Sequence, residues 1–96
     1  MAYPFTAASL LPALKVDLGI SATVYDERLT ARLDTAMERI TAEGVTLQDT
    51  VGDKDLVLMY AAWLWRGRVE QSPMGRMLRV ALNNRVFGEA AREVST

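Results

Sequence analysis

Ten consecutive apolar residues, Leu56 to Trp65, restrict the folds open to this chain more than any other feature. The run is too short to cross a bilayer as a helix, which takes about 20 residues. A helix that is apolar on every side has to be buried on every side. The chain has 96 residues and therefore room for one domain. We expect this helix at its centre, surrounded by other helices or by a neighbouring subunit.

Two helices are predicted before the apolar one. The first starts at Ser9 or Leu11 and stops at Gly19, a residue that readily adopts the left-handed conformation of a helix C-terminus. The second begins after Thr23 and ends at Gly44, because apolar residues recur between them at the spacing of one helix face. The residues of that face are Leu29, Leu33, Ala36, Met37 and Ile40.

The apolar run is expected in a third helix that begins at Asp53, a residue type that caps helix N-termini. A polar and exposed loop, Gln48 to Gly52, precedes it. Trp63 and Trp65 point in different directions on this helix. Packing of both rings in the core and exposure of one ring at an interface therefore both remain open.

A fourth helix is predicted after a short loop, with Ser72 as its cap and Pro73 at its first position. One of its stripes is mostly apolar and consists of Met74, Leu78, Ala81, Leu82 and Arg85. Another stripe is polar and consists of Arg76, Arg79 and Asn83. Because arginine makes planar, paired hydrogen bonds, this stripe favours contacts with carboxylates or phosphates. A solvated helix face is the alternative.

The predicted fold class is therefore all-α: a small bundle of about four helices with one long loop and an extended C-terminal tail. Residues 1–85 are predicted to form a single helical domain, and residues 86–96 a charged tail that leaves it. Half of the residues are hydrophobic, which is enough for a core and argues against a disordered chain.

Charge is distributed unevenly along the chain. Residues 1–65 hold five basic and nine acidic residues, a balance of −4, whereas residues 66–96 hold six and three, a balance of +3. If the two parts lie on different faces, a head-to-tail contact between copies is favoured, and such contacts can close into a ring. The alternative is that the charges neutralise each other within one subunit.

The composition removes most catalytic and metal-binding chemistry. The chain has no Cys and no His, so it lacks thiol nucleophiles, imidazole bases and the usual zinc ligands. Asp53 and Asp55 are two residues apart and do not share a helix face, which makes them a poor acid–base pair. We expect no enzyme activity, no cofactor and no metal. The N-terminus lacks the basic region of a signal peptide, which predicts a soluble cytosolic product with no membrane contact.

A helix-turn-helix regulator that binds DNA is an alternative function. The third and fourth helices are separated by a short loop, and the fourth carries Arg76, Arg79 and Asn83. Two features disfavour it. The third helix is too apolar to lie across a phosphate backbone, and the chain has a net charge of −1, whereas DNA affinity depends largely on positive charge.

Four segments resemble the small head–tail connector proteins of tailed bacteriophages, also called head completion or portal adaptor proteins. These segments are Leu14 to Gly19, Tyr25 to Leu29, Tyr60 to Arg66, and Met77 to Phe87. The last one, Met-Leu-Arg-Val-Ala-Leu-Asn-Asn-Arg-Val-Phe, is the most specific and is similar to the C-terminal segment of connectors from actinobacterial phages. Gly75 departs from the family pattern, in which a proline is common at this position.

The resemblance implies a helical structural protein without catalytic activity, located in the virion at the head–tail junction and made in the cytoplasm of the host bacterium. Its partners would be other copies of itself in a ring, commonly a dodecamer, together with the portal protein above and the next neck protein, a stopper or tail terminator, below. DNA would pass through the ring without sequence-specific binding.

The resemblance also suggests roles for particular residues. The C-terminal segment would dock on the portal, with Phe87 as its apolar anchor or, alternatively, folded back on its own core. The portal-binding candidates are Arg85, Val86, Phe87, Glu89, Arg92 and Glu93. The candidates for contacts between subunits are Arg28, Arg32, Arg39, Arg66 and Arg68, with solvated surface as their default interpretation. The candidates for a loop that lines the channel or meets the next neck protein are Gln48, Asp49 and Asp53.

Overall fold

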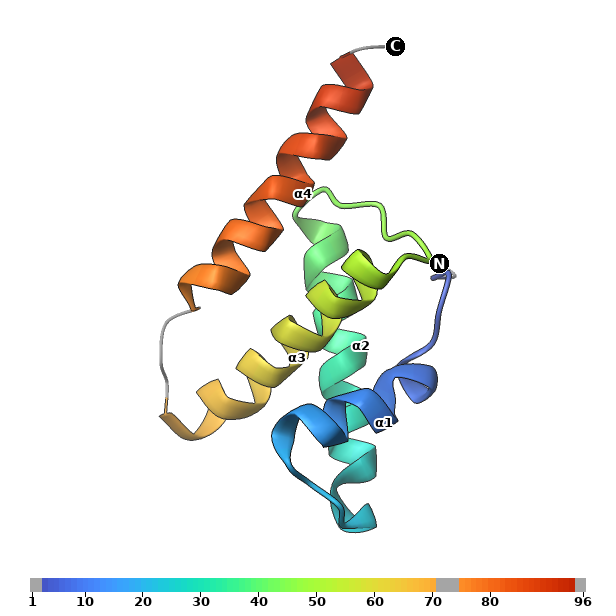
Figure 1. Ribbon diagram of the computed structural model, residues 1–96, viewed down its shortest axis with the longest axis vertical. Helices are drawn as coiled ribbons and strands as arrows, with labels where there is room; N and C mark the ends of the chain where they lie inside the picture. The colour runs from blue at the N-terminus through green and yellow to red at the C-terminus, as the bar shows by residue number, and fades with distance from the viewer. Residues whose placement is uncertain (1–2, 71–74, 95–96) are drawn as a thin grey trace.

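The helix predicted at the centre, α3 (Val51–Glu70), packs against all three other helices (Figure 1). The computed structural model describes residues 3–70 and 75–94, with side chains for 3–67 and 75–89. The other elements are α1 (Ala7–Leu18), a short 3-10 helix η1 (Thr23–Tyr25), α2 (Asp26–Ala42) and α4 (Arg76–Val94). These ranges contain no strand. The predicted all-α bundle of about four helices is confirmed.

Helix α1 begins earlier than predicted because Thr6, not Ser9, is its N-cap. The Thr6 side-chain oxygen accepts a hydrogen bond from the Ser9 backbone N–H at 3.2 Å. The end of the helix was predicted correctly: Gly19 follows Leu18 with a φ of 70°. The Ile20 N–H then donates to the Lys15 carbonyl at 2.9 Å, which closes the last turn.

Helix α2 buries the face that its sequence pattern predicted. All five apolar residues of that stripe, Leu29, Leu33, Ala36, Met37 and Ile40, are buried. Asp26 and Glu27 occupy its first turn, where carboxylates are stabilised by the helix dipole. The Lys15 Nζ lies 2.7 Å from Asp26 Oδ1 and joins the last turn of α1 to the start of α2.

Helix α3 begins two residues before Asp53, so the predicted N-cap role of Asp53 is wrong. Thr50 has this role instead: its side-chain oxygen accepts a hydrogen bond from the Asp53 backbone N–H at 3.2 Å. The expected burial on all sides holds for only part of the helix. Residues 56–62 are buried except for the half-buried Met59, whereas residues 63–65 are all half-buried.

The loop between α2 and α3 is the long loop of the fold. It leaves α2 through Gly44, which has a φ of 104° and so favours glycine. Val45 and Leu47 then point into the core, whereas Gln48 and Asp49 are exposed. The buried side chains of Val45 and Leu47 hold the loop against the helices, so its backbone lies beside the start of α3.

Helix α4 packs against α3 through Leu78 and Leu82, and its C-terminal part projects beyond the other helices (Figure 1). The helix runs to Val94, so the predicted boundary at residue 85 falls inside it and residues 86–94 are not an extended tail. Since Ala90 and Ala91 favour helix, local propensity explains this continuation. The predicted cap, Ser72 to Met74, lies outside the described residues. The Gly75 carbonyl accepts the Arg79 N–H at 3.0 Å, which starts the described helix.

Candidate functional site

Arg85 joins three parts of the chain at one point. Its Nε donates to Asp53 Oδ1 at 2.7 Å, and its Nη2 lies 3.1 Å from Asp53 Oδ2. The same Nη2 is 2.9 Å from the Thr46 carbonyl and 3.1 Å from Glu89 Oε1, one turn further along α4. The guanidinium therefore fixes α4 to the start of α3 and to the loop before it.

Burial makes this contact stronger than an ordinary surface ion pair. Asp53 is only 4% exposed and Glu89 is also buried. A buried carboxylate is tolerated when charged hydrogen-bond donors satisfy it. The hydrogen bond that Arg85 donates to Asp53 is the largest cause that raises the pKa of Arg85 above its usual value, and Glu89 makes a smaller contribution. Arg85 consequently remains a fixed positive charge in the folded chain.

Asp53 also holds the loop that precedes α3. Its Oδ2 accepts a hydrogen bond from the Gln48 backbone N–H at 2.8 Å. Of the three residues suggested for a channel-facing loop, Gln48 and Asp49 are exposed, but Asp53 points inward. Asp49 pairs with Lys54 at 2.9 Å. The carboxylate available on the outside of this loop is therefore that of Asp49.

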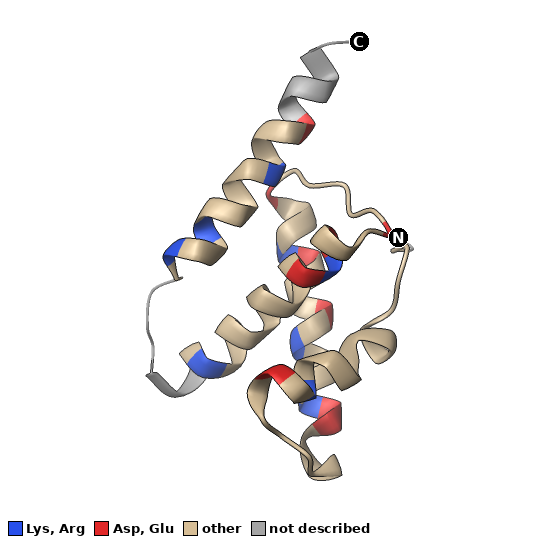
Figure 2. Ribbon diagram, viewed as in Figure 1, with Lys and Arg blue, Asp and Glu red and all other residues tan. Residues whose placement is uncertain are grey.

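A second ion pair joins α4 to the end of α2. The Arg79 Nη1 lies 3.2 Å from Glu43 Oε1, and both side chains are partly exposed to solvent. An exposed pair of this kind contributes little, about 0–1 kcal/mol. The pair nevertheless compensates the charge of Arg79, one of the three residues of the predicted polar stripe, within the chain. Figure 2 shows basic residues at intervals along α4.

The outer face of α4 is apolar as well as basic. Met77 is 79% exposed, Phe87 is 72% exposed, and Val80 is exposed between them. With 100° of rotation per residue, Val80 and Phe87 point away from the side that Leu78 and Leu82 bury. A helix that is apolar on two opposite faces has one face for its own core and another available to a partner.

Sequence reasoning detected only part of this outer face. Phe87 was singled out as an apolar anchor, and the structure keeps it exposed instead of folded back on its own core. Met77 and Val80 were not singled out. The signal was present in the spacing, because both residues fall outside the stripe that contains Leu78 and Leu82.

The other portal-binding candidates differ in exposure. Arg85 and Glu89 are engaged inside the chain, and Val86 is half-buried against the core. Phe87 therefore has the most accessible side chain of the candidates whose side chains are described. Arg92 and Glu93 belong to α4, but their side chains lie outside the described residues.

The candidates for subunit contacts lie on the surface of α2 and near the end of α3. Arg28, Arg39 and Arg66 are exposed and Arg32 is half-buried, with its Nε buried and without a hydrogen-bond partner. The side chain of Arg68 is outside the described residues. Within the described part of the chain, none of the other four forms an ion pair. Their positive charge is available to an acidic partner.

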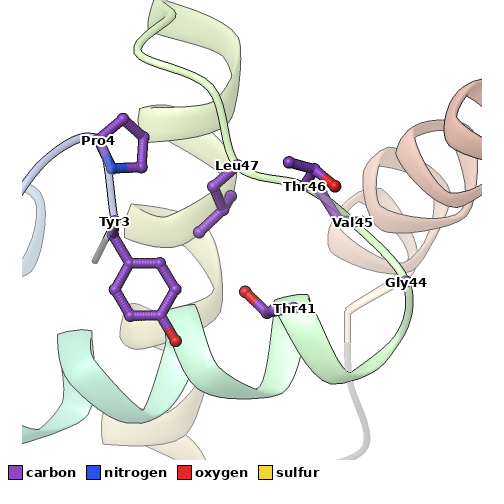
Figure 3. Close-up of a pocket in the computed structure, with 7 residues that line it drawn as sticks. All are labelled: Tyr3, Pro4, Thr41, Gly44, Val45, Thr46 and Leu47. Atoms are coloured by element: carbon purple, nitrogen blue, oxygen red, sulfur yellow. The ribbon is translucent and has the colours of Figure 1, made fainter. Parts of the chain in front are cut away.

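A shallow pocket of about 270 Å³ lies between the N-terminal segment and the loop after α2 (Figure 3). Tyr3, Thr41 and Leu47 are among the residues that line it. The Thr41 side-chain oxygen is buried without a hydrogen-bond partner, and Figure 3 shows it directed toward the space beside the Tyr3 ring. None of the residues that line this pocket has a charged side chain.

The described residues contain no cluster of three or more potential metal ligands. Among the described helices, none is long and apolar enough to span a bilayer. Comparison with known protein families, with curated proteins and with solved structures found no match to this chain. The features of the chain that bear on its function are therefore its own residues, above all those on the two faces of α4.

Proposed function

We propose that this chain is a structural virion protein of a tailed bacteriophage, a head–tail connector. In this proposal its copies form a ring beneath the portal, join the head to the tail and extend the DNA channel. The ring, commonly a dodecamer in the family that the sequence resembles, would contact the portal on one side and a stopper or tail terminator on the other. The chain has no catalytic role, cofactor or metal in this account.

The observation that carries the proposal is the exposed position of Phe87 on a helix that Arg85 anchors. The Arg85–Asp53 contact holds α4 in a defined direction, and Phe87 lies 72% exposed two residues further on. A large aromatic side chain on a fixed, projecting helix suits insertion into an apolar groove of another protein. The segment that carries Phe87 is also the one with the most specific resemblance to phage connectors.

The same face of α4 disfavours the DNA-binding alternative. A recognition helix presents polar side chains to base edges and phosphates. On α4 the corresponding surface carries Met77, Val80 and Phe87, and Arg79 is already paired with Glu43. These exposed apolar side chains, together with the basic ones, would pack better in a groove of another protein than in a groove of DNA.

The proposal is tested by binding of the purified chain to portal rings encoded in the same genome. The chain should co-sediment with the rings, and Phe87→Ser should weaken binding at least about tenfold, as loss of an interface hot spot does. Because Phe87 is largely exposed, the helical content of the variant should not change.

Val51→Ser is the matched control, since Val51 is 77% exposed on α3 and belongs to neither face of α4. It should bind portal rings as well as the wild type does. If the wild-type chain does not bind, the proposed function is wrong. Equal binding by the Phe87 variant and the wild type would contradict the role assigned to α4.

A further inference from the structure

Helix α2 has two stripes of opposite charge outside the apolar face that it buries (Figure 2). The α2 basic stripe consists of Arg28, Arg32 and Arg39, and the α2 acidic stripe consists of Glu27, Asp34 and Glu38. With 100° of rotation per residue, the members of each stripe lie within about 40° of one another, and the two stripes are about 120° apart. Arg32 is half-buried and the other five residues are exposed. Because each stripe belongs to one helix, it is a single surface that a partner can reach.

Neither stripe is neutralised within the described part of the chain. The ion pairs there all use other side chains. Lys15, which reaches α2 from α1, is engaged by Asp26. The other described carboxylates without an ion pair, Asp17 and Asp55, belong to α1 and α3 and do not pair with the basic stripe. The charges of both stripes are therefore available to another molecule.

The order of charges along α2 is unfavourable for a helix that meets only solvent. Residues four positions apart are neighbours on a helix surface, and like charges at this spacing destabilise the helix. This spacing places Arg28 beside Arg32 and Asp34 beside Glu38. Residues adjacent in the chain point about 100° apart and do not face each other. A partner of opposite charge on each stripe would relieve this repulsion.

The end of α3 adds to the positive charge beside the basic stripe. Tyr25 lies three residues before Arg28 and neighbours it on the surface of the chain. The Tyr25 ring packs edge-on against Trp65 of α3, with 5.8 Å between ring centroids. Arg66 follows Trp65 and is exposed, without an ion pair among the described residues. This neighbouring charge has the same sign as the basic stripe, so it does not neutralise it.

The two stripes match each other along the helix axis. Their members fall at three levels: Glu27 with Arg28, Asp34 with Arg32, and Glu38 with Arg39. At 1.5 Å of rise per residue, the members of the first and third levels differ by about 1.5 Å in height, and those of the second level differ by about 3 Å. An arginine side chain is longer than these offsets. When two copies of α2 lie parallel, all three levels can therefore form ion pairs at once.

We propose that the α2 basic stripe of one copy binds the α2 acidic stripe of the next. This inference rests on the proposed function, because it identifies the surfaces that join adjacent subunits of the ring. Neighbours in a ring differ by a rotation of 360° divided by the number of copies, so equivalent helices of neighbours run nearly parallel in a large ring. The contact is heterologous, since each copy turns one stripe toward each neighbour. An angle of about 120° between the stripes makes the series of copies curve, as closure requires.

Cysteine cross-linking tests this contact, because the wild-type chain has no Cys and each introduced thiol is unique. Glu27→Cys and Arg28→Cys chains are prepared separately, mixed at high concentration without portal rings and treated with a short bis-maleimide linker. The mixture should give a mixed dimer, because parallel stripes bring the two positions to the same level. Each variant alone should give far less dimer, because a heterologous contact does not bring identical stripes together.

A charge reversal placed in one chain or the other gives a matched control. Arg39→Glu in the Arg28→Cys chain sets like charges opposite each other and should lower the mixed dimer about three- to tenfold. Glu38→Arg in the Glu27→Cys chain should then restore it. Arg39→Glu in the Glu27→Cys chain should leave the mixed dimer unchanged, because the basic stripe of that chain points away from this contact. Both positions are exposed, so helical content should stay the same.

The orientation of the two helices is tested with Arg28→Cys and Glu38→Cys. On parallel helices these positions differ by about 15 Å in height, so the mixture should give only background dimer. A yield equal to that of the Glu27→Cys mixture would overturn the parallel contact. An equal loss of mixed dimer when Arg39→Glu is placed in either chain would also overturn it.

Portal binding is measured separately, with the wild-type chain and Phe87→Ser. If the mixed dimer forms and the wild-type chain does not bind portal rings, the proposed function fails and the contact between copies stands. If portal binding is present and the mixed dimer is absent, only the contact fails.

Discussion

Arg85 on α4 makes a paired contact with the buried carboxylate of Asp53 on α3, with Nε to Oδ1 at 2.7 Å and Nη2 to Oδ2 at 3.1 Å. The two residues are 32 positions apart in the chain. Through this contact a helix that buries only a narrow apolar stripe acquires a fixed orientation. Because the orientation of α4 determines where Phe87 and Met77 point, the contact connects the stability of the fold with the outer face of α4.

Arg85→Ala should lower the free energy of unfolding by about 2–4 kcal/mol, because it leaves the Asp53 carboxylate buried without its main partner. Arg85→Lys should recover only part of this loss, since an ammonium group cannot make the paired contact. Urea denaturation followed by circular dichroism measures both effects.

Arg76→Ala is the control for this prediction, because Arg76 is an exposed arginine on the side of α4 opposite Arg85. It should change the free energy of unfolding by no more than about 0.5 kcal/mol. The double variant Arg85→Ala/Asp53→Ala should lose less stability than the two single variants together. Additive losses would mean that the two side chains do not stabilise each other.

Truncation should destabilise the chain much more on the buried face of α4 than on its exposed face. Leu82 is completely buried, so Leu82→Ala should cost about 2–5 kcal/mol of unfolding free energy. Met77→Ala, on the exposed face, should cost less than about 0.5 kcal/mol. Thermal unfolding of the two variants distinguishes the faces. A comparable loss for Met77→Ala would show that this side chain belongs to the core of the subunit and not to an interface.

Gly19 and Gly67 should show opposite effects when replaced by alanine. Gly19 has a φ of 70°, so Gly19→Ala should destabilise the chain by about 1 kcal/mol through backbone strain. Gly67 lies inside α3, and an added Cβ there would meet no atom within 4 Å. Gly67→Ala should therefore stabilise the chain by about 0.5–1 kcal/mol. Calorimetry of both variants measures the contrast, and a shift in the same direction for both would contradict it.

Much of the fold could be predicted from local patterns. The buried stripe of α2 and the stop at Gly19 follow from helical spacing and from the conformational freedom of glycine. Thr50 and Asp53 are separated by three positions, the spacing of a capping box. The correct start of α3 was therefore also present in the sequence, although Asp53 was assigned to the cap.

The remaining features depend on contacts between distant segments. The pattern of α4 placed Arg85 on the inward stripe, but nothing in the sequence identified Asp53 as its partner across 32 positions. The tail was predicted from the charge of residues 86–96 and from the family resemblance, whereas the helical propensity of Ala90 and Ala91 favoured continuation. The spacing of Met77 and Val80 already placed them outside the stripe of Leu78 and Leu82, but only the structure shows that both are exposed.

The proposed function requires this chain to form a ring beneath a phage portal. Electron cryomicroscopy of portal rings incubated with the purified chain tests it most directly. We expect a closed ring of copies on one end of the portal, with α4 at the portal contact and the channel continuing through the ring. Portal rings that stay bare, or that carry isolated copies without a ring, would contradict it.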